Sequence, residues 1–335
     1  MNNTILSLKE IAQVLNVSPS TVSLVLHDKP GVSDITRERV VQLLKTHGYI
    51  DDKKMSDINK VIRLFKYSAQ SYFSEKSDGF SDSLINSIGL EARNLGFSIV
   101  ITVCHVGEFI KYLEMIESEQ QDGMILLGTD LPLVYRDYFR NCSVPVVMVD
   151  SSMPMSNIDS VVIDNYGCIY QALDHLYHTG HRNIGYVHSC LDTANFRGRY
   201  KAFYSIMNEM GLTVSPDNIY TVIPSMNGSY NNFSMYIRNR RPFPSALLAD
   251  NDTIAIGCIK ALRDSGYRIP EDISVIGFDN NPFGQMSDPT LTTISIPTDF
   301  MGITAVRMLN SRINAPDRPI CSIIISGELI VRGST

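Results

Sequence analysis

Hydrophobic positions follow two different patterns along this 335-residue chain, and the pattern changes near residue 60. Within the first fifty residues they recur every three or four positions in short stretches, which predicts amphipathic helices. From Val61 onward, short apolar runs alternate with longer amphipathic stretches, which is typical of α/β folds with parallel sheets. We therefore expect an all-α segment at 1–50, a linker at 51–60 and a larger α/β region at 61–335.

Start and stop signals divide the all-α segment into three short helices. Ser7 and Glu10 make a capping-box pair at the first start, and Ser18 followed by Pro19 marks the second. A third helix is expected to begin near residue 33 and to end near residue 48. The apolar stripes expected to pack inward are Leu8, Ile11, Ala12 and Leu15, then Val22, Val25 and Leu26, then Ile35, Val40, Leu43 and Leu44.

Two short helices joined at residues 16–18, with a third packed beneath them, make a helix-turn-helix arrangement. The second helix leaves a face away from its apolar stripe, and such a face can reach the major groove or hold phosphates. The candidate DNA-contacting residues are Ser7, Ser18, Pro19, Ser20, Thr21, Ser23, Leu24 and His27. A small helical bundle without a DNA role is the alternative.

Charge is distributed unevenly over the chain. The whole protein has a formal net charge of −6, which does not suggest a nucleic-acid partner, because phosphate contacts need local positive charge. Residues 1–50 nevertheless carry a net charge of +1, from Lys9, Lys29, Arg37, Arg39 and Lys45 against Glu10, Asp28, Asp34 and Glu38. A DNA role must therefore rest on helix geometry.

The α/β region is predicted to hold strands at 61–67, 98–104, 124–127, 146–150, 184–187, 219–223, 246–249, 274–278 and 323–331. Helices are expected between them, for instance at 80–94, 166–178, 196–210, 251–265 and 298–310. Ligands of open α/β sheets bind beyond the carboxyl ends of the strands. Polar side chains stand at such ends or open the helices that follow: Asp150, Arg199, Asn251, Asp252 and Asp279. They suit a polyol, whose hydroxyls donate and accept, although any single Asp could instead cap a helix.

Particular runs of residues carry a family resemblance. They include Leu8-Lys9-Glu10-Ile11-Ala12 and Val17-Ser18-Pro19-Ser20-Thr21-Val22-Ser23 in the first segment, and 180–187, 197–203, 249–252, 275–279, 289–294 and 328–335 further on. The chain resembles the lactose- and galactose-repressor type of transcriptional regulator nearly end to end. That resemblance implies a helix-turn-helix headpiece at 1–50 followed by two lobes like those of periplasmic sugar-binding proteins.

The resemblance also implies how the lobes and their site are built. The first lobe would hold residues 61–163 and 295–320, and the second 164–290 and 321–335, with crossings near Asp164, between 287 and 295, and near Ile320. Arg199, Asn251, Asp279 and Asp164 match effector-binding positions of the family. Asn227 stands where relatives place an aromatic wall, so we expect Tyr72 and Phe73, in the loop after the first strand, to replace it.

The expected partners follow from this resemblance. They are double-stranded operator DNA, a small-molecule effector such as a sugar, and a second copy of the chain in a homodimer. Ile58 matches the position of a minor-groove wedge, in a linker that also carries three aspartates, Asp51, Asp52 and Asp57. The effector could either release DNA or favour its binding.

Other functional classes lack their motifs in this sequence. A transport protein would need an export signal, and an enzyme would need a phosphate loop, a dinucleotide fingerprint or a nucleophile elbow. The pair His178 and His181 has no spaced third ligand, so we expect neither a metal nor another cofactor. No apolar run reaches the length of a membrane span, and six scattered cysteines suggest buried, reduced thiols in a cytoplasmic protein.

Overall fold

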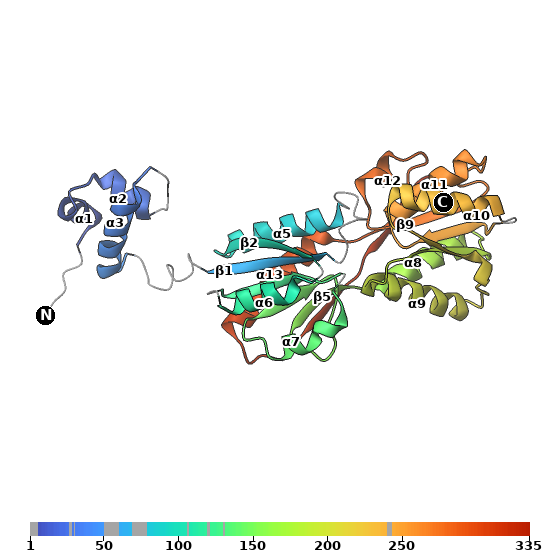
Figure 1. Cartoon of the computed structure of the whole chain (residues 1–335). Helices are drawn as coiled ribbons and strands as arrows, with labels where there is room; N and C mark the ends of the chain where they lie inside the picture. Colours follow the sequence, from blue (N-terminus) through green and yellow to red (C-terminus); the bar gives the residue numbers. More distant parts are fainter. Residues whose placement is uncertain are drawn as a thin grey trace. The chain divides into compact units, whose positions relative to one another are not determined.

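The computed structural model describes residues 6–26, 29, 31–49, 60–68, 79–105, 107–118, 121–129, 131–239 and 243–335. Internal contacts divide the chain near residue 60 into two units, and each is described here by itself (Figure 1). Of the predicted linker at 51–60, residues 51–59 lie outside the described residues, as do His27, Ile58, Tyr72 and Phe73.

The headpiece consists of α1 (Leu8–Val14), α2 (Pro19–Leu26) and α3 (Asp34–Thr46). The predicted capping box at α1 is confirmed, because Glu10 N–H donates to Ser7 Oγ while Ser7 N–H donates to Glu10 Oε2 at 2.7 Å. Ser18 caps α2 by accepting from Thr21 N–H at 3.0 Å. The three helices enclose a core of Ile11, Ala12, Leu15, Val22, Val25, Val40 and Leu44.

Helix α3 ends as predicted but buries a narrower stripe than expected. Gly48 adopts a φ of +74°, and Tyr49 N–H donates to Leu44 O at 2.9 Å, which together form a Schellman-type end. Ile35 was expected in the core, and this was wrong, because its side chain is 75% exposed. It precedes Val40 by five residues, or about 140° around the helix, and therefore points away from the core.

Lobe 1 is built on a six-stranded sheet in the order β11-β5-β4-β3-β1-β2. The strands are β1 (Val61–Ser68), β2 (Ser98–His105), β3 (Gly123–Leu127), β4 (Val146–Val149), β5 (Asp159–Ile163) and β11 (Ser322–Ile325). Helix α13 (Thr298–Asn314) packs on β3, β4 and β5 and against α5 (Phe80–Asn94). The core that includes Phe65, Met124 and Met148 is covered by α6 (Phe109–Ser118), the 3-10 turn η1 (Leu133–Tyr135) and α7 (Arg136–Arg140).

Lobe 2 is built on a second sheet in the order β12-β10-β9-β8-β6-β7. The strands are β6 (Ile184–Ser189), β7 (Ile219–Val222), β8 (Ala246–Ala249), β9 (Ser274–Phe278), β10 (Thr292–Ser295) and β12 (Glu328–Ile330). Strand β12 pairs antiparallel with β10, whereas β6 to β10 pair in parallel. The helices are α8 (Asn165–His178), α9 (Ala194–Glu209), η2 (Pro216–Asn218), α10 (Met226–Asn239), α11 (Asp252–Asp264) and α12 (Pro282–Met286).

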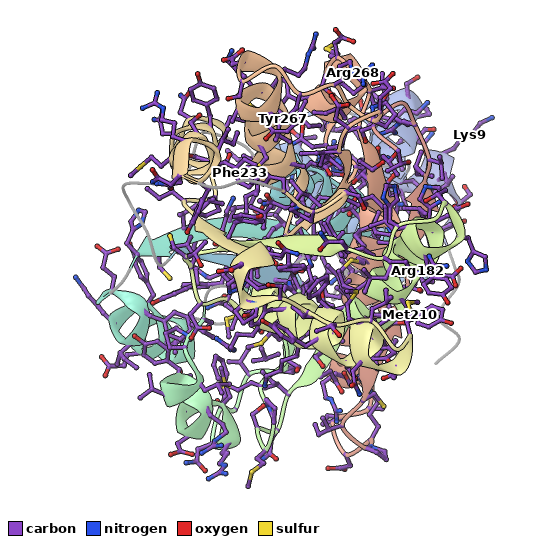
Figure 2. The ribbon with its side chains drawn as sticks, turned by 90° about the vertical axis from the view of Figure 1, so that its right-hand side faces the viewer. Lys9, Arg182, Met210, Phe233, Tyr267 and Arg268 are labelled. Atoms are coloured by element: carbon purple, nitrogen blue, oxygen red, sulfur yellow. The ribbon has the colours of Figure 1, made fainter. Side chains whose placement is uncertain are left out.

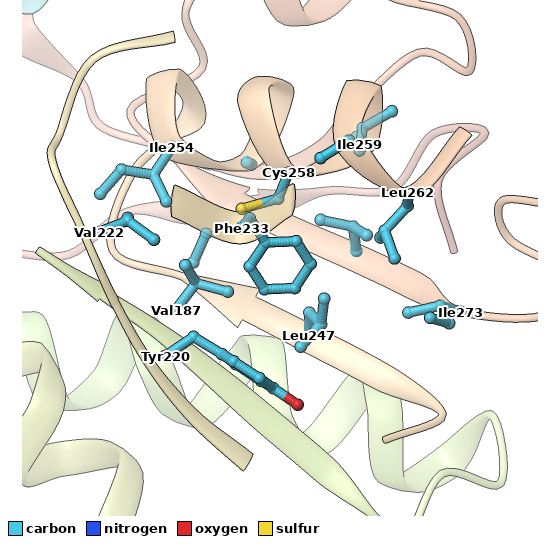
Figure 3. Packing of buried hydrophobic residues seen from close by; sticks show 14 of the residues in the cluster. Val187, Tyr220, Val222, Phe233, Leu247, Ile254, Cys258, Ile259, Leu262 and Ile273 are labelled. Atoms are coloured by element: carbon cyan, nitrogen blue, oxygen red, sulfur yellow. The ribbon is translucent and has the colours of Figure 1, made fainter. Parts of the chain in front are cut away.

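Two helix pairs cover the sheet of lobe 2. Helices α8 and α9 pack together, and α10 and α11 form the other pair. Figure 3 shows Phe233 of α10 and Cys258 of α11 packed with Leu247 of β8 in a fully buried apolar cluster. Arg182 lies at the surface of this lobe (Figure 2). Its guanidinium carbon lies 3.6 Å from the centre of the Tyr177 ring.

The chain crosses three times between the lobes, as the resemblance implied, but two crossings differ in position. The first lies at Asp164, between β5 and α8, as expected. The second follows Ser295 directly, since β10 still belongs to lobe 2. The third lies at residues 326–327, because the run 323–331, expected as one strand, forms β11 in lobe 1 and β12 in lobe 2.

The cysteines also differ in part from the expectation. All six are free thiols, and Cys104, Cys168 and Cys258 are buried as expected. Cys190 and Cys321 are exposed. Within the described ranges, no helix combines the length and the apolar character that a membrane crossing requires.

Candidate functional site

Helix α2 presents a face to the surface of the headpiece. Pro19, Ser20 and Ser23 are exposed, and Thr21 and Leu24 are half-buried, so all five reach the surface. Two of the expected contact residues also have a local role, since Ser7 and Ser18 cap helices α1 and α2. Hydrogen bonds from Ser7 hold the pKa of Glu10 below its usual range. The Glu10 side chain therefore stays ionised in the first turn of α1, where a negative charge interacts favourably with the helix dipole.

Asp150 lies just after β4 in lobe 1 and is nearly fully buried. Its φ of +64° is in the left-handed region, which non-glycine residues seldom adopt away from turns and functional sites. Thr129 donates a hydrogen bond to its carboxylate. From lobe 2, Asn195 Nδ2 donates to Asp150 O at 2.9 Å and to Asp150 Oδ1 at 2.8 Å.

Arg199 lies one turn beyond Asn195 on α9 and is 3% exposed. Its Nε donates to Asn165 Oδ1 at 3.0 Å, and its Nη1 donates to Asp250 O at 2.5 Å. Its Nη2 lies 3.7 Å from Asp279 Oδ1, and its guanidinium carbon lies 3.5 Å from the centre of the Phe278 ring. The guanidinium is thus fixed from several directions, which orients its charge.

Asp279 follows β9 in a backbone conformation that the surrounding residues hold. Its φ is +103°, and that of Asn280 is +54°. Arg332 Nη2 donates to Asn280 Oδ1 at 2.7 Å, and Asn281 N–H donates to Asp252 Oδ2 at 2.6 Å. Local strain of this kind persists only where neighbours enforce it, and it clusters at functional sites.

Asp164 and Asn251 occupy helix N-caps. Helix capping was the alternative role that the sequence left open for single polar residues of this kind. Asp164 Oδ1 accepts from Gly167 N–H at 2.9 Å at the start of α8, and Asn251 Oδ1 accepts from Ile254 N–H at 3.0 Å at the start of α11. Both side chains are half-buried. Asn227, which the resemblance placed at an aromatic position of the family, is exposed on α10.

The structure also brings together residues that the sequence did not single out. Asp250 is fully buried and accepts from Tyr186 Oη and from Ser189 N–H, both at 2.6 Å, while His188 Nδ1 lies 2.8 Å from it. Burial, together with the nearby Asp250 charge, raises the pKa of Tyr186 well above its ordinary value. The run 249–252 was a signal for Asp250, but Asn165 and Asn195 had no comparable sequence signal.

The histidine pair expected to bind no metal has other partners. His178 Nδ1 lies 3.4 Å from Asp174 Oδ1, and His181 Nδ1 is hydrogen-bonded to Ser245 Oγ at 2.9 Å. Among the residues that the structure describes, no group of three or more His, Cys, Asp or Glu side chains is placed to hold a metal ion.

The buried carboxyl of Asp252 should make the stability of the folded protein depend on pH. Burial raises the pKa of its carboxyl to about 7, against the lowering effect of hydrogen bonds from Thr293 and Asn281. Because this pKa is higher in the folded protein than in the unfolded chain, the contribution to stability is complete at low pH and is lost as pH rises through about 7. Urea unfolding at pH 5 and pH 8 should show a smaller difference in Asp252→Asn than in the unaltered protein. Equal differences in the two proteins would contradict this assignment.

Two parts of the chain match known protein families. Residues 7–52 match the family described as bacterial regulatory proteins, lacI family, and residues 173–335 match the periplasmic binding protein-like domain. The first range spans the three headpiece helices. The second spans most of lobe 2 and the segment that returns to lobe 1 as α13 and β11.

Similar proteins match nearly the whole chain. The HTH-type transcriptional repressor CytR of Escherichia coli is 28% identical over 339 residues, covering 99% of this chain and 97% of CytR. PurR of Pasteurella multocida is 27% identical, covering 98% of each protein. The lac repressor dimer bound to operator and the anti-inducer ONPF shares the fold, with a TM-score of 0.74 at 21% identity and 99% coverage of both chains. The CelR–cellobiose complex also has a TM-score of 0.74, at 23% identity, covering 98% of this chain and 100% of that one.

Proposed function

Since the chain belongs to the lacI family of bacterial regulatory proteins, the lactose- and galactose-repressor type, we propose that it represses transcription from operator DNA under the control of a small molecule. The observation that carries the proposal is the headpiece, a capped helix-turn-helix whose second helix exposes a small, mostly polar face. Residues 1–50 bind DNA, 51–60 link, and 61–335 bind the effector and a second copy of the chain. Catalysis has no part in this function, which is exerted in the cytoplasm.

DNA recognition falls mainly to the second helix and its N-terminus, with Ser7 at the start of the first helix. The contacting residues are Ser7, Ser18, Pro19, Ser20, Thr21, Ser23, Leu24 and His27, with Ile58 as a minor-groove wedge in the linker. The hydroxyls position the protein on phosphates, and the remaining side chains face base edges. A homodimer places two headpieces on a pseudo-palindromic operator, and the lac repressor is a relative that binds its operator as a dimer.

The effector binds between the lobes, at Asp150, Asp164, Arg199, Asn251 and Asp279, with Tyr72 and Phe73 as its aromatic wall. Carboxylates, an amide and a guanidinium suit a polyol because each hydroxyl both donates and accepts. The half-buried ring of Phe196 beside Arg199 adds apolar surface. A sugar or sugar derivative therefore fits this set best, and CelR is a relative solved with a sugar, cellobiose.

Effector and operator act on each other by linkage. Effector binding changes the relation of the lobes, which changes how the dimer presents its headpieces. Coupling of this kind amounts to about 1–3 kcal/mol and is reciprocal. Footprinting on the DNA upstream of the protein's own gene, repeated with a panel of sugars, tests both halves. No protected sequence at any protein concentration would contradict the proposal.

Operator affinity is expected to fall with salt. If two headpieces neutralise several phosphates, log affinity decreases linearly with log salt, with a slope of about −0.9 for each phosphate contacted. The three linker aspartates, Asp51, Asp52 and Asp57, should make this slope shallower than for a relative with a basic linker. Fluorescence anisotropy between about 50 and 200 mM salt measures it. A slope near zero would mean that DNA is not the partner.

A further inference from the structure

One chain of hydrogen bonds runs from lobe 1 to the guanidinium of the proposed effector site. Arg199 Nε donates to Asn165 Oδ1 at 3.0 Å, and Asn165 Nδ2 donates to Asn195 Oδ1 at 2.9 Å. Asn195 Nδ2 then donates to both the carboxylate and the backbone carbonyl of Asp150, at 2.8 and 2.9 Å. Only this last link joins the lobes, because Asp150 belongs to lobe 1 and the other three residues belong to lobe 2.

The direction of every bond in this chain follows from its two ends. A guanidinium can only donate, so Asn165 must turn its oxygen toward Arg199 and its amide hydrogens toward Asn195. Asn195 must then accept with its oxygen and donate with its nitrogen, and the carboxylate of Asp150 can only accept. Both amides are therefore locked in one orientation by a cation at one end and an anion at the other.

Burial makes the chain energetically significant. Asp150, Asn195 and Arg199 are 3%, 7% and 3% exposed. Hydrogen bonds are electrostatically stronger in such surroundings than in water, and an unpaired buried polar group is costly there. The two ends are also held independently, since Thr129 donates to Asp150 and Arg199 is fixed by Asp250 and Asp279. A shift of the Arg199 guanidinium therefore reaches lobe 1 through the two amides.

We propose that Asn195 is the positioning residue that couples effector contact at Arg199 to the relation of the two lobes. This proposal rests on the proposed function, because it assigns the regulation of the same site. An effector that draws Arg199 toward itself pulls Asn165 and Asn195 with it and changes the bond to Asp150. The lobe arrangement responds because that bond crosses from one lobe to the other.

The experiment exchanges the two side chains that meet across the lobes. Asn195→Asp sets a carboxylate against the Asp150 carboxylate, and adding Asp150→Asn restores a donor facing an acceptor. We expect Asn195→Asp to change the affinity for DNA upstream of the protein's own gene by at least about fivefold, the lower end of typical coupling. Its radius of gyration in small-angle X-ray scattering should also increase. The double exchange should move both values back toward those of the unaltered protein, because it restores the bond between the two side chains but not the bond to the Asp150 carbonyl.

Asn218→Asp is the matched control. Asn218 is also a buried amide of lobe 2, at 9% exposed, and its Nδ2 donates to Asn183 Oδ1 at 2.6 Å within the same lobe. This variant is expected to melt at a lower temperature while its radius of gyration and DNA affinity stay unchanged. If Asn195→Asp does not fold, Asn195→Ala removes the donor without adding a charge, and its DNA affinity and radius of gyration are compared with those of Asn218→Ala.

The outcomes separate this proposal from the proposed function. If the unaltered protein does not bind the upstream DNA specifically, the proposed function is contradicted. The radius of gyration of the variants then tests by itself whether Asn195 controls the relation of the two lobes. A folded Asn195→Asp with unchanged affinity and radius overturns the role of Asn195. So does a change in Asn195→Asp that the double exchange fails to reverse.

Discussion

Removal of residues 1–58 is expected to abolish specific operator binding and to leave the two lobes folded. Helices α1 to α3 enclose a core of their own, and the lobes have separate cores built on two sheets. Specific DNA binding typically exceeds non-specific binding by about a thousandfold or more, and the truncated chain should lose that whole margin. Anisotropy titration with operator DNA measures the loss, and circular dichroism with thermal melting confirms folding.

A pair of point variants refines this prediction. Ser20→Asp places a carboxylate on the exposed face of α2, where phosphate repulsion should weaken binding by about tenfold or more. Gln42→Glu adds the same charge on an exposed position of α3 and should have a much smaller effect. Specific retardation of operator DNA by the truncated protein, or equal losses in the two point variants, would refute the assignment of α2 as the recognition helix.

Arg199→Ala is expected to weaken effector binding by ten- to a hundredfold or more. A hydrogen bond from a charged group contributes about 1.5–3 kcal/mol, and its loss leaves the partner unsatisfied. The same change should lower the free energy of unfolding by about 1–3 kcal/mol, because the bonds that the buried guanidinium donates to Asn165 Oδ1 and to Asp250 O are lost. Calorimetric titration with the sugar found by footprinting, together with urea unfolding, measures both effects.

Two further variants separate binding from bracing of the lobe. Arg197→Ala removes an arginine two positions away whose ion pair with Asp192 is partly exposed, so it should change either quantity only slightly. Asp279→Asn keeps the shape of its side chain while removing the charge, and should weaken effector binding more than it lowers stability. Wild-type effector affinity in both Arg199→Ala and Asp279→Asn would remove these residues from the site.

Features that depend on neighbours in the chain could be read from the sequence. The capping box of Ser7 and Glu10, the start at Ser18 and the end at Gly48 involve residues three to five apart, and the structure contains all of them. Most strands could also be predicted locally, because a strand buried on both faces of its sheet is a continuous run of apolar residues. The resemblance of these ordered motifs to the lactose- and galactose-repressor type gave the family and the two-lobed fold.

Features that depend on distant partners appeared only in the tertiary structure. The run 323–331 reads as one strand, and only its pairing with β5 and then β10 splits it between the lobes. The strands β5 and β10 were not predicted; both are short, and the structure identifies them by their pairing with β4 and with β9. Ile35 is exposed because the position of Val40 and Leu44 in the shared headpiece core sets the rotation of α3.

Some residues of the candidate site could be predicted from the sequence, and others appeared only in the structure. The sequence placed Asp150, Arg199, Asn251 and Asp279 at strand ends or helix starts, because the order of strands and helices fixes which residues follow them. It could not show that Asn165 and Asn195 join Arg199 to Asp150, since those residues are separated by up to 49 positions and are joined by side-chain hydrogen bonds. Local spacing determines which elements form, whereas such contacts exist only once the two sheets have brought their ends together.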